Sequence, residues 1–240
     1  MEFFKKYAYI YLLVLAGAIV LSCAASAGVT MVSNMRDAAA ETPLTIVIDP
    51  GHGGEDGGAV SCTGVCESRL NLEIALRLND LLRLAGYETK MTRSEDVSIY
   101  DSSAKTVSEK KISDLKNRVR AVNGTENALL VSIHQNLFEQ ARYHGAQVFY
   151  APTEGSKTLA ESVQTALRLG LDPTNHRQIK ESLTVYLMRN IRCPGILVEC
   201  GFLSNAEEEA KLRSEDYQKQ LVCAIASGLT ACLLEAEGAV

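Results

Sequence analysis

The sequence predicts a single α/β domain with a mostly parallel (mixed) central sheet flanked by helices, preceded by an N-terminal hydrophobic helix. Three observations support this fold class. Short apolar, β-branched runs alternate along the chain with longer segments of helical spacing. Neither an internal repeat nor a linker to a second domain interrupts this alternation. The first 36 residues are far more apolar than the rest, so we divide the chain into residues 1–36 and 37–240.

The first segment, residues 1–36, has the composition of a signal peptide or a membrane anchor. Lys5 and Lys6 precede an apolar run, and no charged residue lies between Lys6 and Arg36. An uncleaved helix of ~20 residues would anchor the chain and leave its body outside the membrane. Cleavage near Ala25–Ala27 and lipid modification of Cys23 are the alternatives. We therefore expect an exported protein, either anchored in the membrane or secreted.

The first half of the body is expected to run strand, loop, helix, strand, helix. These elements are, in order, Leu44–Ile48, the glycine-dense Pro50–Gly64, Glu67–Ala85, Glu88–Thr92 and Ile112–Asn123. The strands are short apolar or β-branched runs, whereas apolar residues recur along one face of each helix. Gly86 follows the first helix, as glycine often does at a helix end. The polar stretch Lys105–Lys111 is either a loop or the start of the second helix.

The second half is expected to run strand, strand, helix, strand, strand, helix. These elements are Leu129–Ile133, Ala146–Tyr150, Ser156–Leu169, Leu183–Leu187, Ile196–Cys200 and Asp216–Leu234. The run Leu183–Leu187 is also compatible with a helix. Cys223 and Cys232 fall in the last helix, where we expect small buried core residues. Ligands of such a sheet bind at the carboxyl ends of its strands.

Charge and cysteine content exclude two classes of protein. The net charge of −5 offers no basic surface to displace counterions, which excludes an electrostatic nucleic-acid binder. The seven cysteines are an odd number without regular spacing, so the chain is not a disulfide scaffold. Cys62 and Cys66 share a short loop and could form a bridge. The body is also large enough to bury a core without disulfides.

Three side chains at the expected carboxyl edge suggest a metal site. His52 follows the first strand, His134 ends the strand Leu129–Ile133, and Glu67 opens a helix, where a carboxylate is favoured by the free N–H groups. Two imidazoles and one carboxylate form a typical ligand set for catalytic zinc. Each residue also has a simpler interpretation: a histidine in the core or on the surface, or an acid at a helix start. His144 and His176 are expected to be surface or loop residues.

Glu199 is the candidate catalytic base. It ends an apolar strand, where a carboxylate is costly to bury unless it is paired or functional. Next to a metal-activated water it could accept a proton and then deliver it to a leaving amine. Burial would raise its pKa, which suits a proton shuttle, although a metal charge acts in the opposite direction. Membership of a salt bridge is the alternative.

Four blocks of sequence occur in order along the body. They are Ile48–Gly54, Glu67 with Asn71 and Leu72, Ser132–Asn136, and Leu197–Asn205. Together they resemble the zinc-dependent N-acetylmuramoyl-L-alanine amidases of cell-wall metabolism. The resemblance implies one Zn²⁺ ion bound by His52, Glu67 and His134, with Glu199 as catalytic acid and base. It also implies peptidoglycan as substrate, cleaved between N-acetylmuramic acid and L-alanine of the stem peptide, by a catalytic zinc amidase domain over residues 37–240.

Three further stretches are similar to the germination-specific, spore-cortex subgroup of this family. They are Met91–Asp96, Leu115–Arg118 and Gly145–Gln147. The subgroup resemblance implies the first step toward muramic-δ-lactam, coupled to a peptidoglycan deacetylase, with an accessory protein as a further hypothesis. It also places the chain at the outer face of the cytoplasmic membrane, in the cell wall or in the forespore intermembrane space.

Several alternatives stay open at this point. The chain could be a general vegetative cell-wall amidase or a non-catalytic peptidoglycan-binding protein, although all four site positions are filled. Cys66 adjoins Glu67 and could supply a thiolate ligand. The glycine-rich loop could bind phosphate, but it lacks the Lys-Ser/Thr ending of a P-loop.

Overall fold

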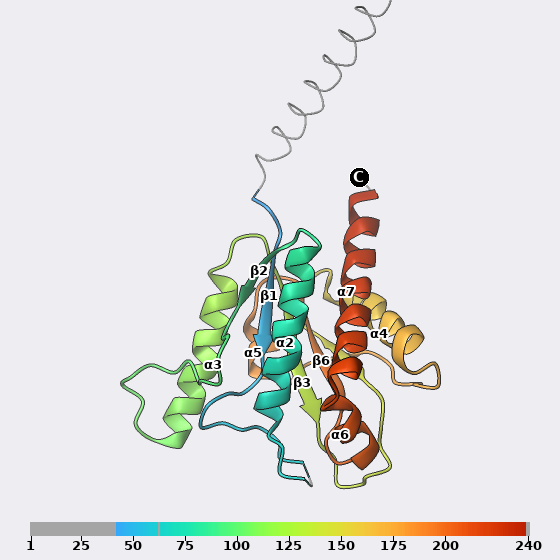
Figure 1. Cartoon of the computed structure of the whole chain (residues 1–240). Helices are drawn as coiled ribbons and strands as arrows, with labels where there is room; N and C mark the ends of the chain where they lie inside the picture. The colour runs from blue at the N-terminus through green and yellow to red at the C-terminus, as the bar shows by residue number, and fades with distance from the viewer. Residues whose placement is uncertain (1–41, 62, 239–240) are drawn as a thin grey trace, which may run out of the picture. The chain divides into compact units, whose positions relative to one another are not determined.

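The computed structural model describes residues 42–61 and 63–238. The expected leader, with its alternatives at Cys23 and Ala25–Ala27, lies outside the described residues, as does Cys62. The described chain forms one α/β domain around a six-stranded sheet with the order β2-β1-β3-β6-β4-β5 (Figure 1). The predicted fold class is therefore confirmed.

The sheet is mixed, as the sequence predicts. Its strands are β1 (Thr45–Pro50), β2 (Glu88–Met91), β3 (Ala128–Asn136), β4 (Gln147–Tyr150), β5 (Lys180–Glu181) and β6 (Gly195–Phe202). Parallel pairs join β1 to β2 and β3, β3 to β6, and β4 to β5. Among the strand pairs of the described residues, only the β4–β6 pair is antiparallel. Strands β1, β3 and β6 therefore end at one edge of the sheet, toward which the arrows of β1 and β3 point in Figure 1.

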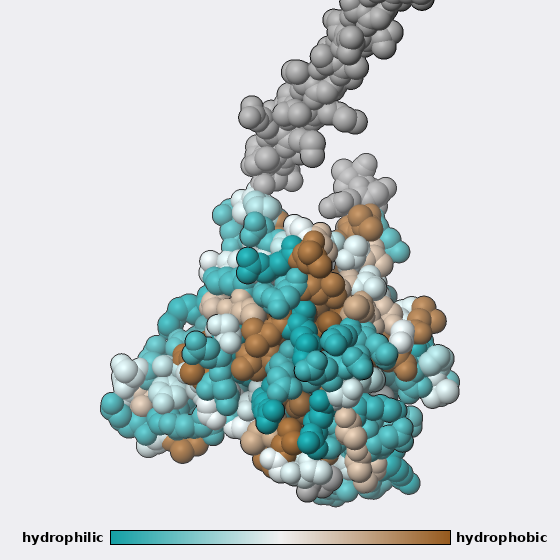
Figure 2. Space-filling model, in the orientation of Figure 1, coloured by the Kyte–Doolittle hydropathy of each residue, from teal (hydrophilic) through white to brown (hydrophobic). Residues whose placement is uncertain are grey.

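Helices cover both faces of the sheet. They are α2 (Glu67–Leu84), α3 (Val107–Asn123), α4 (Ser156–Leu171), α5 (Tyr186–Asn190), α6 (Ala206–Leu212) and α7 (Glu215–Gly238). The larger core lies between the sheet and helices α2, α4 and α7, and the smaller core lies under α3 and α5. Figure 1 shows α2 and α7 side by side in front of the sheet. On this side of the molecule, hydrophobic patches interrupt a largely hydrophilic surface (Figure 2).

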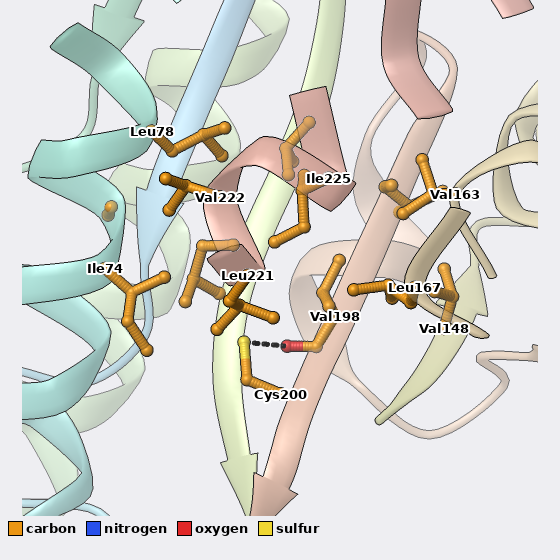
Figure 3. Close-up of a cluster of buried hydrophobic side chains, with 14 of the residues drawn as sticks. Ile74, Leu78, Val148, Val163, Leu167, Val198, Cys200, Leu221, Val222 and Ile225 are labelled. Carbon is orange, nitrogen blue, oxygen red and sulfur yellow. Dashed lines mark hydrogen bonds between the residues drawn. The ribbon is translucent and has the colours of Figure 1, made fainter. Parts of the chain in front are cut away.

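The larger core explains why α2, α4 and α7 pack on the same face of the sheet. Figure 3 shows Ile74 of α2, Leu167 of α4 and Ile225 of α7 directed into one hydrophobic cluster, and all three side chains are buried. Burying each such side chain contributes roughly 1.5–3 kcal/mol. Among the described helices, α7 alone is long and apolar enough to cross a membrane. Because it packs on α2 and α4, we interpret it as a core helix.

Cys200 belongs to this core. Its thiol is fully buried and donates to the carbonyl of Val198 (Figure 3). Burial raises the pKa of the thiol well above its ordinary range, so Cys200 acts as a small apolar residue. Cys232 is partly buried against the same core, whereas Cys223 is exposed. The expectation of a buried Cys223 is wrong because α7 turns its other face, with Leu221, to the sheet.

The strand expected over Leu183–Leu187 is also wrong. Helix α5 begins at Tyr186, and the nearby strand is the two-residue β5. A helical turn buries the neighbours Leu187 and Met188 together in the smaller core, whereas a strand would direct them to opposite faces. Leu183 stays exposed.

Of the two alternatives for the polar stretch Lys105–Lys111, the helix start is confirmed, whereas the helix that follows Asn205 was not predicted. Helix α3 begins within the polar stretch, where Thr106 and Glu109 form a reciprocal capping box. Helix α6 begins after Asn205, whose side chain accepts hydrogen bonds from two backbone N–H groups. Both caps are polar signals that apolar periodicity does not detect.

Candidate functional site

The structure brings the three expected metal ligands together. His52 follows β1, Glu67 is the first residue of α2, and His134 lies near the end of β3. One ligand atom from each falls within 4.8 Å of the others. Within the described residues, His52, Glu67 and His134 form the group of side chains that could hold a metal ion. Cys66 is not part of it.

The Glu67 carboxylate lies between the two imidazoles. Its Oε1 is 2.9 Å from Nδ1 of His134, and its Oε2 is 3.3 Å from Nε2 of His52. Although burial opposes ionisation, the hydrogen bonds and charges of the two histidines hold the pKa of Glu67 far below its usual range. An ionised carboxylate is the form that a metal ion requires.

Three donors from the protein fix the Glu67 carboxylate in place. The backbone N–H of Ala59 donates to Oε2 at 2.9 Å, and that of Gln135 donates to Oε1 at 3.1 Å. The side-chain amide of Asn71 also donates to Oε1, at 3.3 Å, and to the carbonyl of Gly51. Asn71 thus ties the glycine loop to the helix that carries Glu67.

Asp56 orients the second expected ligand, His52. Its Oδ2 lies 3.0 Å from Nδ1 of His52, which leaves Nε2 facing Glu67. Burial lowers the pKa of His52, but the carboxylates of Glu67 and Asp56 outweigh it and raise the pKa above 6.5. Carboxylates in this position commonly set the tautomer of a metal-bound histidine. Nothing in the local sequence distinguishes Asp56 from the other polar residues of its loop, so this role could not be predicted.

Two glycines lack the side chains that would otherwise fill the space occupied by His134 and Glu67. A Cβ at Gly51 would lie 2.2 Å from the ring of His134. A Cβ at Gly58 would lie 2.6 Å from Oε2 of Glu67, and the φ of Gly58 is +67°, which side-chain-bearing residues rarely adopt. A residue with a side chain at either position would therefore clash with His134 or Glu67.

Glu199 lies beside these ligands on β6. It pairs with His134 across the β3–β6 ladder, so both side chains project from the same face of the sheet. Oε2 of Glu199 is buried and has no hydrogen-bond partner among the described residues. Burial, reinforced by the charge of Glu67, raises the pKa of Glu199 to about 7. The direction agrees with the sequence-based expectation.

Two buried arginines support the loop that carries His52. Arg118 donates to Asp49 and to the carbonyls of Pro50 and His52, at 2.7–2.8 Å. Arg93 donates to four backbone carbonyls, including that of Gly51 at 3.0 Å. Both arginines lie in stretches that the subgroup resemblance singled out, but sequence alone gave no reason to assign them this role.

The residues present fit a catalytic metal ion. Two imidazole nitrogens and a carboxylate are a donor set suited to zinc with one position open. The orphaned oxygen of Glu199 has the polarity and burial expected of a group that faces an attacking water. A cavity of about 280 Å³ adjoins His52 and His134, and Tyr186 of α5 lines its other side.

Comparison with known proteins gives the family context. Residues 46–231 match the family model described as N-acetylmuramoyl-L-alanine amidase. The germination-specific N-acetylmuramoyl-L-alanine amidase of Bacillus subtilis is 38% identical over 185 residues, which cover 77% of each chain. The amidase LytC of the same organism is 33% identical over 187 residues, which cover 77% of this chain and 34% of LytC.

Solved structures agree with these sequence relatives. The CwlD amidase of Clostridioides difficile, solved in complex with the GerS lipoprotein, has a TM-score of 0.76 and 38% identity. The match covers 79% of this chain and 98% of CwlD. An N-acetylmuramoyl-L-alanine amidase from Clostridium difficile 630 has a TM-score of 0.69 and 34% identity, with 80% and 98% coverage. The resemblance drawn from the four sequence blocks is therefore confirmed.

Proposed function

Because this chain belongs to the N-acetylmuramoyl-L-alanine amidase family, we propose that it hydrolyses the amide between N-acetylmuramic acid and L-alanine with one zinc ion bound by His52, Glu67 and His134. The amidase class itself is common to the family match and to the named relatives. The observation that carries the proposal is the convergence of three ligand atoms within 4.8 Å beside a buried, unpartnered Glu199 oxygen.

The ligand residues are prepared for a cation before it binds. Glu67 is ionised and held by three N–H donors, and Asp56 orients His52. Zinc, when bound in such a site, supplies Lewis acidity that activates water and polarises the amide carbonyl. Net negative charge on Glu67 and Asp56 would balance the charge of the ion locally.

Glu199 moves the proton. With a pKa of about 7, it is partly ionised at neutral pH, and it accepts a proton at its free Oε2 from the attacking water. The same oxygen then donates that proton to the nitrogen of the departing L-alanine as the amide C–N bond breaks. Burial of Glu199 favours the neutral, proton-carrying form in between.

The proposal extends to the biological setting, which the germination-specific relative supports. We infer a role in spore germination, which the name of the relative supports. From the resemblance to the spore-cortex subgroup, we propose that this role is the first step toward muramic-δ-lactam in cortex peptidoglycan, before a deacetylase acts. The solved complex of CwlD with the lipoprotein GerS supports an accessory protein for this chain as well. Substrate of this kind lies outside the cytoplasm, so residues 1–36 serve as a signal peptide or membrane anchor for the domain over 37–240.

Two variants test the roles of the site residues. Glu199→Gln keeps the ligands, so it should retain zinc while turnover of peptidoglycan falls by at least about 100-fold. His134→Ala removes one ligand and should lower the zinc content of the purified protein. Metal analysis and product release are measured on the same samples.

The matched control is Arg192→Met, an exposed substitution before the amino end of β6, where zinc content and turnover should both stay unchanged. Undiminished turnover in Glu199→Gln would exclude it as the base. Unchanged zinc content in His134→Ala would exclude that residue as a ligand.

A further inference from the structure

A second hollow, separate from the cavity at His52 and His134, lies between the loop that precedes β4 and the loop that precedes β5. Its volume is about 360 Å³. It is lined by Arg142, Tyr143, His144, Thr174, Asn175, His176 and Arg177. Two guanidinium groups and two imidazoles thus face the hollow, and none of the lining residues is acidic. The family site described above uses none of these side chains.

Buried contacts hold the two loops together. The amide of Asn175 donates to the carbonyl of Ala146 at 2.8 Å, and its oxygen accepts from the backbone N–H of Arg177 at 3.0 Å. The backbone of Gly145 packs so closely that a Cβ there would lie 2.8 Å from the Asn175 oxygen. The hollow is therefore a built feature of the fold.

Arg177 is fixed in position but keeps unused donors. Its guanidinium lies over the ring of Phe202, 4.4 Å from the centroid. Nε donates to the carbonyl of His144 at 2.8 Å, and Nη1 donates to Oε1 of Gln147 at 3.2 Å. Within residues 42–61 and 63–238, no carboxylate lies in ion-pair range of Arg177, and Nη2 makes no hydrogen bond.

The carboxylates near the hollow are already engaged. Glu208 accepts hydrogen bonds from two backbone N–H groups, including that of Gly145 at 2.8 Å. Asp172 accepts from the N–H and hydroxyl of Thr174, and its other oxygen lies 3.9 Å from Nδ1 of His144. Neither neutralises the guanidinium of Arg177 by direct contact.

Gln147 connects the hollow to the catalytic base. It lies directly opposite Glu199 in the antiparallel β4–β6 pair, so the two side chains share one face of the sheet. Opposed side chains in such a pair have Cβ atoms ~5 Å apart. Arg177 is hydrogen-bonded to the end of the Gln147 side chain. We therefore place the Arg177 guanidinium on the order of 10 Å from the Glu199 carboxyl. This distance equals the length of about three residues of extended chain.

We propose that this hollow, with Arg177 at its centre, binds a free carboxylate of the stem peptide while its L-alanine end lies at Glu199. The inference rests on the proposed amidase site and specifies its substrate: stem peptides with free carboxylates, in preference to amidated ones. Guanidinium groups suit this task because their paired N–H donors match a carboxylate. The ring of Phe202 and the Gln147 amide hold Arg177 ready to do so.

The test uses two N-acetylmuramoyl tripeptides that differ only in whether the carboxylates beyond L-alanine are free or amidated. The zinc-loaded wild-type protein should have at least about a tenfold higher kcat/KM for the free form, mainly through KM. Arg177→Met should lower kcat/KM about tenfold on the free form and leave the amidated form unchanged. Arg177→Lys keeps the charge and should restore part of the preference, and Arg192→Met should match wild type.

Two results would overturn the proposal. One is cleavage of both substrates by the wild type with equal kcat/KM; the other is an equal loss on both substrates in Arg177→Met, which would indicate a structural role. A binding measurement separates this inference from the amidase proposal. Calorimetry with the released L-alanyl tripeptide should show affinity that Arg177→Met reduces. If wild type cleaved neither substrate yet bound the tripeptide through Arg177, the amidase proposal would fail and the carboxylate site would stand.

Discussion

The arginines on the two sides of the site differ in how fully the protein uses their donors. Arg93 and Arg118 are 4% and 2% exposed, and they donate to backbone carbonyls and to Asp49. Arg142 and Arg177 line an open hollow, and neither has a carboxylate in ion-pair range within the described part of the chain. A saturated, buried cation supports the fold, whereas a cation with unused donors is available to a ligand.

The acidic residues divide in the same way. Asp49 is fully buried and accepts from Arg118, Thr92 and Ser132, which together hold its pKa below the usual range against the effect of burial. Glu199 is equally inaccessible at Oε2 but has no partner there. Buried polar groups are nearly always hydrogen-bonded, and among the buried side-chain atoms of the described residues only the oxygens Gln135 Oε1 and Glu199 Oε2 lack a partner. Of the two, the Glu199 oxygen belongs to the proposed catalytic base.

The largest expected effect on stability comes from breaking the buried ion pair between Arg118 and Asp49. Arg118→Met leaves Asp49 buried without its cation, which should lower the free energy of unfolding by about 3–5 kcal/mol. Urea denaturation measures this, with Arg192→Met as the control that should stay within about 0.5 kcal/mol of wild type. A loss below about 1 kcal/mol for Arg118→Met would show that the buried Arg118 contributes no more to stability than an exposed arginine does.

Neutralising the carboxyl of Glu199, which lacks a partner at Oε2, should have a smaller effect on stability and one of opposite sign. Because the folded-state pKa of Glu199, about 7, exceeds the ordinary 4.5, ionisation costs the folded protein stability. The cost is absent below pH 4.5, grows as the pH rises toward 7, and is complete above it. In metal-free protein, Glu199→Gln should thus be more stable than wild type by about 3 kcal/mol at pH 8 and equal to it at pH 4.

Thermal or urea unfolding at the two pH values measures that difference. Adding zinc should narrow the gap at pH 8, because a nearby cation stabilises the carboxylate of the wild type. Equal stability of the two metal-free proteins at pH 8 would mean that Glu199 has a partner in solution.

A third prediction concerns the carboxylate that orients a ligand. Asp56→Asn keeps the shape of the loop but removes the charge 3.0 Å from Nδ1 of His52. Zinc affinity should fall by roughly 10–100-fold, as measured by competition with a chelator. Glu55→Gln is the matched control, because Glu55 pairs with Lys110 at the surface and touches no ligand. The same zinc affinity in both variants would exclude an orienting role for Asp56.

The smallest effect on stability is expected at the unsaturated arginine. Arg177→Met loses a cation–π contact and two hydrogen bonds at a partly exposed site, so unfolding free energy should fall by about 1 kcal/mol or less. A loss as large as that of Arg118→Met would assign Arg177 to the structural class.

Much of the fold and the choice of site residues could be predicted from local sequence. Apolar periodicity identified α2, α4 and α7, and strand ends in a largely parallel sheet implied that His52, His134 and Glu199 would lie at one edge. Apolar periodicity did not detect the polar signals at helix starts, namely the capping box at Thr106 and the cap at Asn205. The error at Leu183–Leu187 arose because a short apolar run has no period of its own.

The supporting residues of the site could not be predicted for a different reason. Arg118 reaches Asp49 across 69 positions, and Arg177 reaches Gln147 across 30. Whether such a side chain ends on a carbonyl, a carboxylate or open space depends on how distant loops meet. That is set by the packed fold, not by the residues beside it in the sequence.

The central claim is that His52, Glu67, His134 and Glu199 form a zinc-dependent amidase site. The most direct test digests purified cortex peptidoglycan with the full chain, with chelator, and with chelator followed by added zinc, and identifies the products by mass spectrometry. We expect release of intact stem peptides that begin with L-alanine, only when zinc is present. Release unaffected by chelator, or cleavage at any other bond, would contradict it.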